Sequence, residues 1–215
     1  MNIVQPRPPE PLGAPTSPIV ARAIDHARLT CAPYLFNHVM RSWLFAAALA
    51  RIQGIAHDPE IVAVGTILHD VTLNADFAGP RRFEVEGADL ARQFVREAGF
   101  DDRRAQLIWD SVALNSTPSI GLWKEPEVAL CTAGICLDVV GLQAELVPEA
   151  ETARIVAAFP RLEMKRRMTE CFCHMVATQP GTSYDNFLRD FGERFVPGYK
   201  VPSAVDLVLN APFDG

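Results

Sequence analysis

The sequence predicts an all-α protein. Two segments place a capping residue directly before a proline at the first helical position, Ser17-Pro18 and Asp58-Pro59. Gly54 follows an apolar-periodic segment at the position where a helix would end. No run of alternating apolar and polar residues is bounded by hairpin turns, so strands are not predicted.

The expected helices follow one another along most of the chain. The first begins at Pro18 and continues with helical periodicity through IVARAIDHARL. The third begins at Pro59 and continues through EIVAVGTILHDV. The remaining helices are expected at about 34–53, 83–98, 102–115, 125–141, 150–157, 160–178 and 184–191. Prolines interrupt the last twenty or so residues, which can hold at most one short helix.

The domain organisation follows from these segments. Residues 1–16 are rich in proline and predict an extended arm. Residues 17–215 predict one helical domain without an internal repeat. A chain of 215 residues, 49% hydrophobic and 21% charged, can bury a core that needs no disulfide or structural metal to fold.

Composition also limits the partners. The net charge is −6, from 20 basic and 26 acidic residues, and no segment interleaves basic and aromatic residues, so we expect no nucleic-acid partner. No apolar run is long enough for a bilayer, so we expect no membrane association. The five cysteines have no framework spacing and the first residues lack a secretory apolar region, which predicts a reducing cytoplasm. A homo-oligomer is compatible with these features.

His69 and Asp70 end an apolar helical segment, IVAVGTILHD. A second such pair, His57-Asp58, has a simpler explanation, because Asp58 caps the helix that begins at the following proline. Asp70 has no capping role, since an aspartate near a helix C-terminus is opposed by the helix dipole. A positive group should compensate it, and a metal ion would do so.

A second histidine is expected beside this pair. The connection after the 34–53 helix is short, so the next helix is its expected antiparallel partner. His38 lies about 21 Å before the connection and His69 about 15 Å after it, which puts both at the same end of the pair. Farther along, Asp138 is the only acid in CTAGICLDVVGL. A buried carboxylate needs compensation, either from a metal or from an arginine partner.

These residues carry a resemblance. The order of His38, then His69-Asp70, then Asp138 resembles the H…HD…D pattern of the HD-domain metalloenzymes, an all-helical family of metal-dependent hydrolases. The segments NHVMRSW, LHDVTLNADFAGPRRFEVEGADLARQF, LDVVG and NAPF look like the cyanamide hydratase branch, over nearly everything from about residue 18. The resemblance implies an HD-type helical bundle in which these four residues hold one divalent metal ion, usually zinc. It also implies addition of water to the nitrile of cyanamide.

Four protein ligands would have to make room for water, which iron, manganese, nickel or cobalt tolerate as well as zinc. Water with its pKa lowered by the metal would be the nucleophile, and a carboxylate such as Asp70 would handle the proton. By resemblance, Glu84 in RRFEVEG is a candidate for orienting or proton-handling work; the alternative is a solvated glutamate in a first helical turn. Arg41 lies three residues after His38 and is a candidate for binding substrate or a ligand carboxylate, with simple pairing to an acid as the alternative.

One position departs from the branch. A histidine is usual in a segment resembling LHTS, where this chain has Asn115 within ALNS. An asparagine keeps a hydrogen-bonding side chain but cannot shuttle protons near neutral pH. Asn115 is therefore a catalytic candidate whose role would differ from that of the histidine usual in the branch.

Three functions remain open from the sequence. The first is a hydratase or hydrolase of a small nitrile-like or amide-like molecule. The second is an HD-type phosphomonoesterase acting on a nucleotide or another small phosphate ester, although Arg41, Arg81 and Arg82 are the only basic residues near the motifs. The third is a metal-binding protein without activity.

Two further sets of residues are of the types found in binding sites. Five aromatic residues could line an apolar pocket or belong to the core: Phe36, Trp43, Phe77, Phe83 and Trp109. The run Cys171-Phe-Cys173-His174 resembles a metal site, but side chains two residues apart on a helix diverge, so no such site is expected there.

Overall fold

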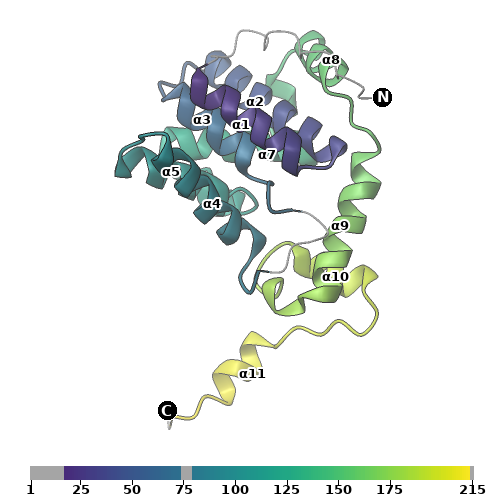
Figure 1. Ribbon diagram of the computed structural model, residues 1–215. Coiled ribbons are helices and arrows are strands. Elements are labelled where there is room, and N and C mark those ends of the chain that lie inside the picture. Colours follow the sequence, from purple (N-terminus) through teal and green to yellow (C-terminus); the bar gives the residue numbers. More distant parts are fainter. Residues whose placement is uncertain (1–16, 74–78, 214–215) are drawn as a thin grey trace.

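The computed structural model describes residues 17–73 and 79–213, and all regular elements within these ranges are helical (Figure 1). The predicted fold class is confirmed for this part of the chain. The predicted proline-rich arm, residues 1–16, and Phe77 lie outside the described residues.

The helices are α1 (Pro18–Thr30), α2 (Pro33–Gln53), α3 (Pro59–Leu68), α4 (Phe83–Glu97), α5 (Asp102–Ala113), α6 (Pro118–Gly121), α7 (Pro126–Val140), α8 (Glu149–Ala158), α9 (Met164–Thr178), α10 (Leu188–Phe195) and α11 (Ala204–Leu209), with short 3-10 turns at Ala144–Leu146 and Pro180–Thr182. The sequence did not predict α6. The helix expected at 184–191 begins only at Leu188 and continues to Phe195.

Helix boundaries lie where the capping residues predicted them, although the Ser17 side chain makes no capping hydrogen bond at the start of α1. The Asp58 side chain accepts hydrogen bonds from the backbone N–H groups of Glu60 and Ile61, which confirms its capping role. Gly54 and Gly141 end α2 and α7 in the left-handed region, with φ of 66° and 78°. The α3 helix ends at Leu68, so the two residues that follow it lie in a turn.

The core is built around α2, which packs against α3 and α7 (Figure 1). Every residue of α3 from Ile61 to Leu68 is buried, as expected of a helix surrounded by others. Contact between α2 and α7 is especially close at Gly134, where a Cβ atom would collide with the backbone carbonyl oxygen of Ser42. This approach brings the end of α7 against the start of α2, where the candidate site residues lie.

The C-terminal helices add a second cluster. Met168 and Phe172 of α9 and Leu188 of α10 pack with Tyr34 of α2 and Phe83 of α4. In Figure 1, α9 and α10 lie beside and below the main helical body, and α11 extends away from it with all its residues exposed. Within the described ranges, we find no helix with the length and apolar character needed to cross a bilayer.

Candidate metal centre

Three side chains converge at the end of the α2–α3 pair. The Nε2 atoms of His38 and His69 are 3.1 Å apart. The Oδ2 atom of Asp70 lies 3.5 Å from Nε2 of His38 and 3.2 Å from Nε2 of His69. All three side chains are buried. The predicted juxtaposition of the two histidines is therefore confirmed, and we call these residues the His-His-Asp cluster.

The hydrogen bonds of the two rings fix where their lone pairs point. Nδ1 of His69 lies 2.7 Å from the Thr66 carbonyl oxygen, and Nδ1 of His38 lies 2.7 Å from Oδ2 of Asp138. Because a carbonyl and a carboxylate can only accept, each Nδ1 carries the hydrogen in the neutral ring. Each Nε2 then presents a lone pair to the centre of the cluster, where the Asp70 carboxylate adds a third acceptor.

This arrangement fits a divalent metal ion. A tetrahedron with metal–ligand distances of about 2.0–2.1 Å has ligand atoms separated by roughly 3.3–3.4 Å. The three separations in the cluster are 3.1, 3.2 and 3.5 Å. Three acceptor atoms at these distances repel one another unless a cation or a proton lies between them. The described residues thus contain a buried group that could hold a metal ion.

The protonation equilibria of the cluster are strongly coupled. Burial lowers the pKa of His38, which favours the neutral imidazole that binds metals. Burial also acts against the charged form of His69, but the Asp70 carboxylate outweighs it and the pKa of His69 is raised. Although burial alone would raise the pKa of Asp70, the positive charge of His69 and His38 in their protonated forms holds it below its ordinary value. Asp70 is therefore ionised, and a metal ion could replace the proton that the imidazoles otherwise hold.

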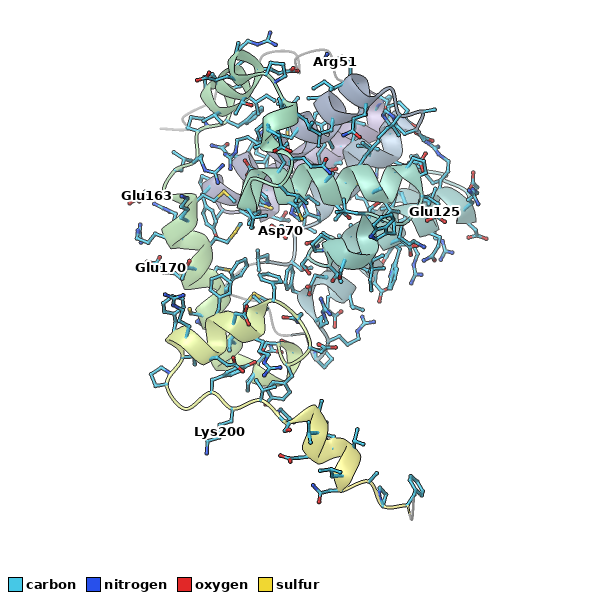
Figure 2. The ribbon with its side chains drawn as sticks, turned by 180° about the vertical axis from the view of Figure 1, so that it is seen from behind. Arg51, Asp70, Glu125, Glu163, Glu170 and Lys200 are labelled. Atoms are coloured by element: carbon cyan, nitrogen blue, oxygen red, sulfur yellow. The ribbon has the colours of Figure 1, made fainter. Side chains whose placement is uncertain are left out.

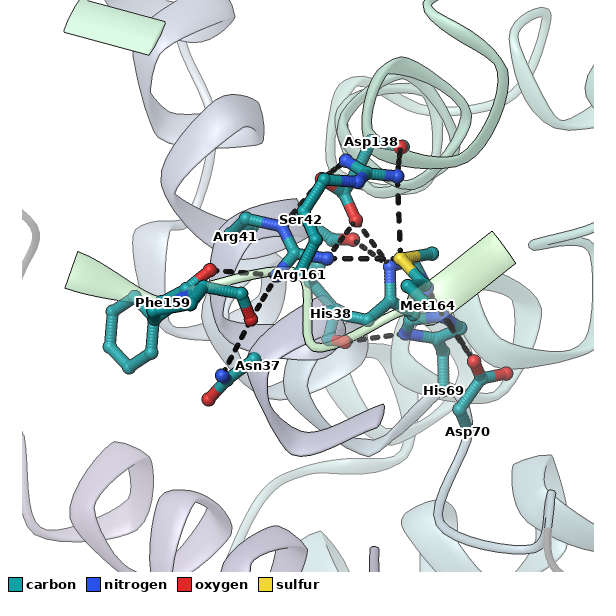
Figure 3. Close-up of polar contacts among 12 residues, drawn as sticks. Asn37, His38, Arg41, Ser42, His69, Asp70, Asp138, Phe159, Arg161 and Met164 are labelled. Atoms are coloured by element: carbon teal, nitrogen blue, oxygen red, sulfur yellow. Dashed lines mark hydrogen bonds and ion pairs between the residues drawn. The ribbon is translucent and has the colours of Figure 1, made fainter. Parts of the chain in front are cut away.

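Asp138 lies at the other ring nitrogen of His38. Its Oδ1 accepts from Nε of Arg41 at 2.7 Å and from Arg161 at 3.0 Å, and its Oδ2 accepts from Arg41 at 2.8 Å and from His38 (Figure 3). The pKa of Asp138 is held well below its ordinary value, because the hydrogen bonds from His38 and Arg41 outweigh the opposing effect of burial. We call Asp138, Arg41 and Arg161 the Asp138 network.

The metal-ligand role predicted for Asp138 is not part of this geometry. The group of possible ligands among the described residues comprises His38, His69 and Asp70 only. The alternative, a buried aspartate paired with an arginine, is present. A carboxylate that accepts from the second nitrogen of a ligand histidine fixes its tautomer and orientation. Asp138 is placed to do this for His38.

Arg41 is fully buried beside Asp138. Besides Asp138, its guanidinium donates to the Phe159 carbonyl oxygen at 2.8 Å and contacts Sδ of Met164 at 3.0 Å. Arg41 does not line the cavity described below. The alternative for Arg41, pairing with an acid, is present, and its partner is the carboxylate that accepts from His38.

A cavity of about 200 Å³ adjoins the His-His-Asp cluster. Figure 2 shows Asp70 between the main helical body and the C-terminal helices. The residues that line the cavity are His38, His69, Asp70, Leu73, Phe83, Asn115, Ser116, Pro118, Ile135, Cys136, Val139, Val140, Met168, Phe172 and Phe187. Its polar side chains are the His-His-Asp cluster, Asn115 and Ser116, and most of the wall is apolar.

The sequence identified only part of this wall. Of the five aromatic residues considered, Phe83 lines the cavity, Trp43 is in the core, and Phe36 and Trp109 pack against the core. Sequence reasoning missed Phe172 and Phe187. The signal that could have found them is the apolar spacing of α9 and α10, but nothing local indicated which face of these helices would meet the cluster.

Asn115 and Glu84 lie near the cavity in different ways. Asn115 is buried and lines the cavity, and its side-chain amide donates to the Val112 carbonyl oxygen at 2.7 Å. Glu84 is fully buried, so the solvated alternative is wrong for it. Its Oε1 accepts from the Ser116 hydroxyl at 2.6 Å and from Arg82 at 2.7 Å. Ser116, which the sequence did not single out, lines the cavity and connects Glu84 to it.

Comparison with known proteins adds no family assignment. No family model matches the chain, and no curated protein matches it. Cys171, Cys173 and His174 are not part of the possible metal-binding group found among the described residues. The geometry of the cluster and its cavity therefore carries the functional argument.

Proposed function

We propose that this chain is a metal-dependent hydratase or hydrolase of the HD type that acts on a small, neutral, nitrile-like or amide-like molecule. One observation carries the proposal. The lone pairs of His38 and His69 and the carboxylate of Asp70 converge in the wall of a cavity whose other side chains are mostly apolar.

The chain supplies three ligands rather than the four expected from the sequence. Two imidazoles and one carboxylate leave open coordination positions, which is the pattern of catalytic rather than structural sites. When bound, a divalent ion supplies Lewis acidity that lowers the pKa of a water molecule. Zinc suits this donor set best, and iron, manganese, nickel and cobalt also accept it.

The surrounding residues would prepare the site for this chemistry. Asp138 and the Thr66 carbonyl oxygen hold the two histidines in the tautomer that binds metal. Asp70 is ionised and adjoins the cavity, so it can also accept a proton from water and return it to a substrate nitrogen. Asn115 and Ser116 line the same cavity and can hydrogen-bond a small polar group.

The cavity favours a neutral substrate over a phosphate ester. No lysine or arginine is among the described residues that line it, whereas phosphate sites use convergent basic side chains. Arg81 pairs with Glu86 and Asp89, and Arg82 pairs with Glu84, so both sequence-identified arginines have acidic partners.

The test begins with elemental analysis of protein purified without chelator, followed by a panel of cyanamide, small nitriles and amides, and nucleoside monophosphates. We expect one metal per chain and turnover of a nitrile or an amide. His69→Ala should lose both. His57→Ala is the matched control, because His57 belongs to the other His-Asp pair and its ring bonds only the Ile55 carbonyl oxygen in a loop. Cleavage of nucleoside monophosphates alone, or an unchanged metal content in His69→Ala, would refute the proposal.

A further inference from the structure

The cavity has two chemically different parts. Its polar side chains are few: the His-His-Asp cluster, Asn115 and Ser116. The remaining wall is made by one side of α7, by residues of α9 and by the segment before α10, namely Ile135, Cys136, Val139, Val140, Met168, Phe172 and Phe187, with Leu73, Phe83 and Pro118. A ligand that fills this space meets the acceptors of the cluster with one group and apolar side chains over most of its remaining surface.

The cavity is larger than cyanamide requires. An apolar cavity of about 150 Å³ accommodates benzene. This cavity measures about 200 Å³, and cyanamide is much smaller than benzene and polar along its whole length. Cyanamide at the cluster would leave most of the apolar wall against water. Such a wall gains binding energy only from a ligand with apolar surface of its own.

The aromatic side of the wall is well ordered by mutual contacts. Phe172 and Phe187 pack edge to face with ring centroids 5.0 Å apart, and Phe83 meets Phe187 edge to face at 6.5 Å. Rings fixed in this way present a preformed apolar surface. It faces the space beside the cluster rather than the core around α2.

The opening of the cavity is apolar as well. Val139 and Val140 line the cavity at the end of α7, yet they are 38% and 74% exposed, so they lie where the cavity meets solvent. An apolar chain longer than the cavity can therefore continue past these residues without meeting a charged side chain of the wall. A charged or strongly hydrated ligand would gain nothing from this entrance.

We propose that the substrate carries an apolar body, an alkyl chain or a single aromatic ring, attached to the neutral carbon–nitrogen group that reacts at the cluster. This inference rests on the proposed function and narrows its substrate class. For a nitrile, addition of one water forms a C=O double bond at the nitrile carbon and converts the C≡N triple bond to a C–N single bond. Both hydrogens of the water end on nitrogen, giving the amide, and no oxidant or reductant is needed.

The first experiment measures kcat/KM of the metal-loaded full chain for cyanamide, for straight-chain nitriles from acetonitrile to hexanenitrile, and for benzonitrile. We expect kcat/KM to rise by about fourfold for each added methylene until the cavity is filled, the factor that corresponds to about 0.8 kcal/mol per buried CH2. A series that is flat, or that is highest for cyanamide, would overturn the inference while leaving the hydratase proposal intact.

A variant that fills the cavity tests where the apolar part of the substrate binds. Ile135 is buried in the cavity wall, and Ile135→Phe should lower the ratio of kcat/KM for hexanenitrile to that for acetonitrile by at least about tenfold, the loss of roughly two buried methylenes. Ile52→Phe, the same exchange at a half-exposed position at the end of α2, should leave the ratio unchanged. If Ile135→Phe does not fold, Met168→Ala can replace it. This change enlarges the cavity and should move the highest kcat/KM to nitriles with longer alkyl chains.

A binding measurement separates this inference from the proposed function. Calorimetric titration of the wild-type chain with the product amides, from acetamide to hexanamide, needs no turnover. Affinity that rises with chain length while no nitrile is hydrated would reject the hydratase and keep the apolar ligand class. Affinity that is independent of chain length would reject the inference whatever the activity.

Discussion

The two ring nitrogens of His38 face opposite surroundings. On the Nδ1 side, every oxygen of the Asp138 carboxylate accepts hydrogen bonds, and the buried guanidinium of Arg41 has acceptors in turn. On the Nε2 side, the ring faces another imidazole lone pair and the carboxylate of Asp70. One side is a closed network of paired charges, and the other is a set of acceptors that needs a cation.

The difference separates a part of the buried polar centre whose charges are paired by the protein's own residues from a part that could hold a metal ion. A buried charge is tolerated when it is paired, and the Asp138 network meets that condition with the protein's own residues. The His-His-Asp cluster meets it only when a metal or a proton is present. The predictions below test this division, from the largest expected effect to the smallest.

Removal of the metal should affect the His-His-Asp cluster and leave the Asp138 network and the fold unchanged. Treatment with a strong chelator is expected to abolish turnover completely, because the cluster then lacks its Lewis acid. The helical circular dichroism signal should stay unchanged, since the core around α2 is large enough to fold without a metal. One equivalent of zinc added back should restore activity. A collapse of the helical signal on chelation would show that the cluster, too, is structural.

Loss of one carboxylate on each side should have unequal effects on stability. Asp138→Asn leaves the charge of Arg41 buried without its anion, and we expect the free energy of unfolding to fall by about 3–5 kcal/mol. Asp70→Asn is the matched control, because the imidazoles beside it can lose their proton when the carboxylate is gone, whereas Arg41 cannot. It should therefore cost less stability than Asp138→Asn in chelator, although it should lose the metal.

Urea unfolding of both variants in the presence of chelator measures this difference directly. Equal losses of stability would contradict the division between the two sides. Retention of full metal affinity by Asp70→Asn, together with loss in Asp138→Asn, would restore Asp138 as the ligand that the sequence predicted.

The sequence could predict the pairing of the histidines because short-range rules determine it. Helical periodicity, the cap at Asp58 and the short connection after Gly54 together make α2 and α3 antiparallel neighbours. Their lengths then place His38 and His69 at one end. No information from distant parts of the chain is needed.

The position of Asp138 and the wall of the cavity could not be predicted in this way. The contact between Asp138 and Nδ1 of His38 depends on the close approach of α7 to α2 at Gly134. It also depends on Arg161, which follows α8 in the chain and donates to Asp138. The aromatic wall depends on how α9 and α10 pack across Phe83. Both are tertiary placements that periodicity does not encode, since it defines an apolar face without naming its partner.

A smaller effect is expected at Asn115, which lines the ligand side of the centre. If a proton shuttle is missing at this position, Asn115→His should raise kcat for cyanamide or a small nitrile by about 10²-fold, at the lower end of what general acid–base assistance contributes. The variant should also acquire a pH dependence near a histidine pKa of about 6.5. Asn115→Gln is the control, because it changes the side chain without adding a titrating group. Lower activity of Asn115→His on the best wild-type substrate would instead mark Asn115 as an adaptation to that substrate.

The smallest effect is expected at Ser116, where the ligand side meets a paired charge. Its hydroxyl donates to the buried Glu84 at 2.6 Å, so its oxygen lone pairs are left to accept from a group in the cavity. Ser116→Ala removes that acceptor and should lower kcat/KM by about three- to tenfold, in line with a net hydrogen bond of about 0.5–1.5 kcal/mol. Ser116→Thr keeps the hydroxyl and should retain activity, and Glu84→Gln should reproduce part of the loss, because the amide orients the hydroxyl less strongly than the carboxylate does. Steady-state kinetics with separate kcat and KM values, together with melting temperatures, distinguish two roles of the Glu84–Ser116 contact. Lower kcat/KM in all three variants with a lowered melting temperature would make the contact part of the folding network. Lower kcat/KM in Ser116→Ala and Glu84→Gln only, at unchanged stability, would place it with the His-His-Asp cluster on the functional side.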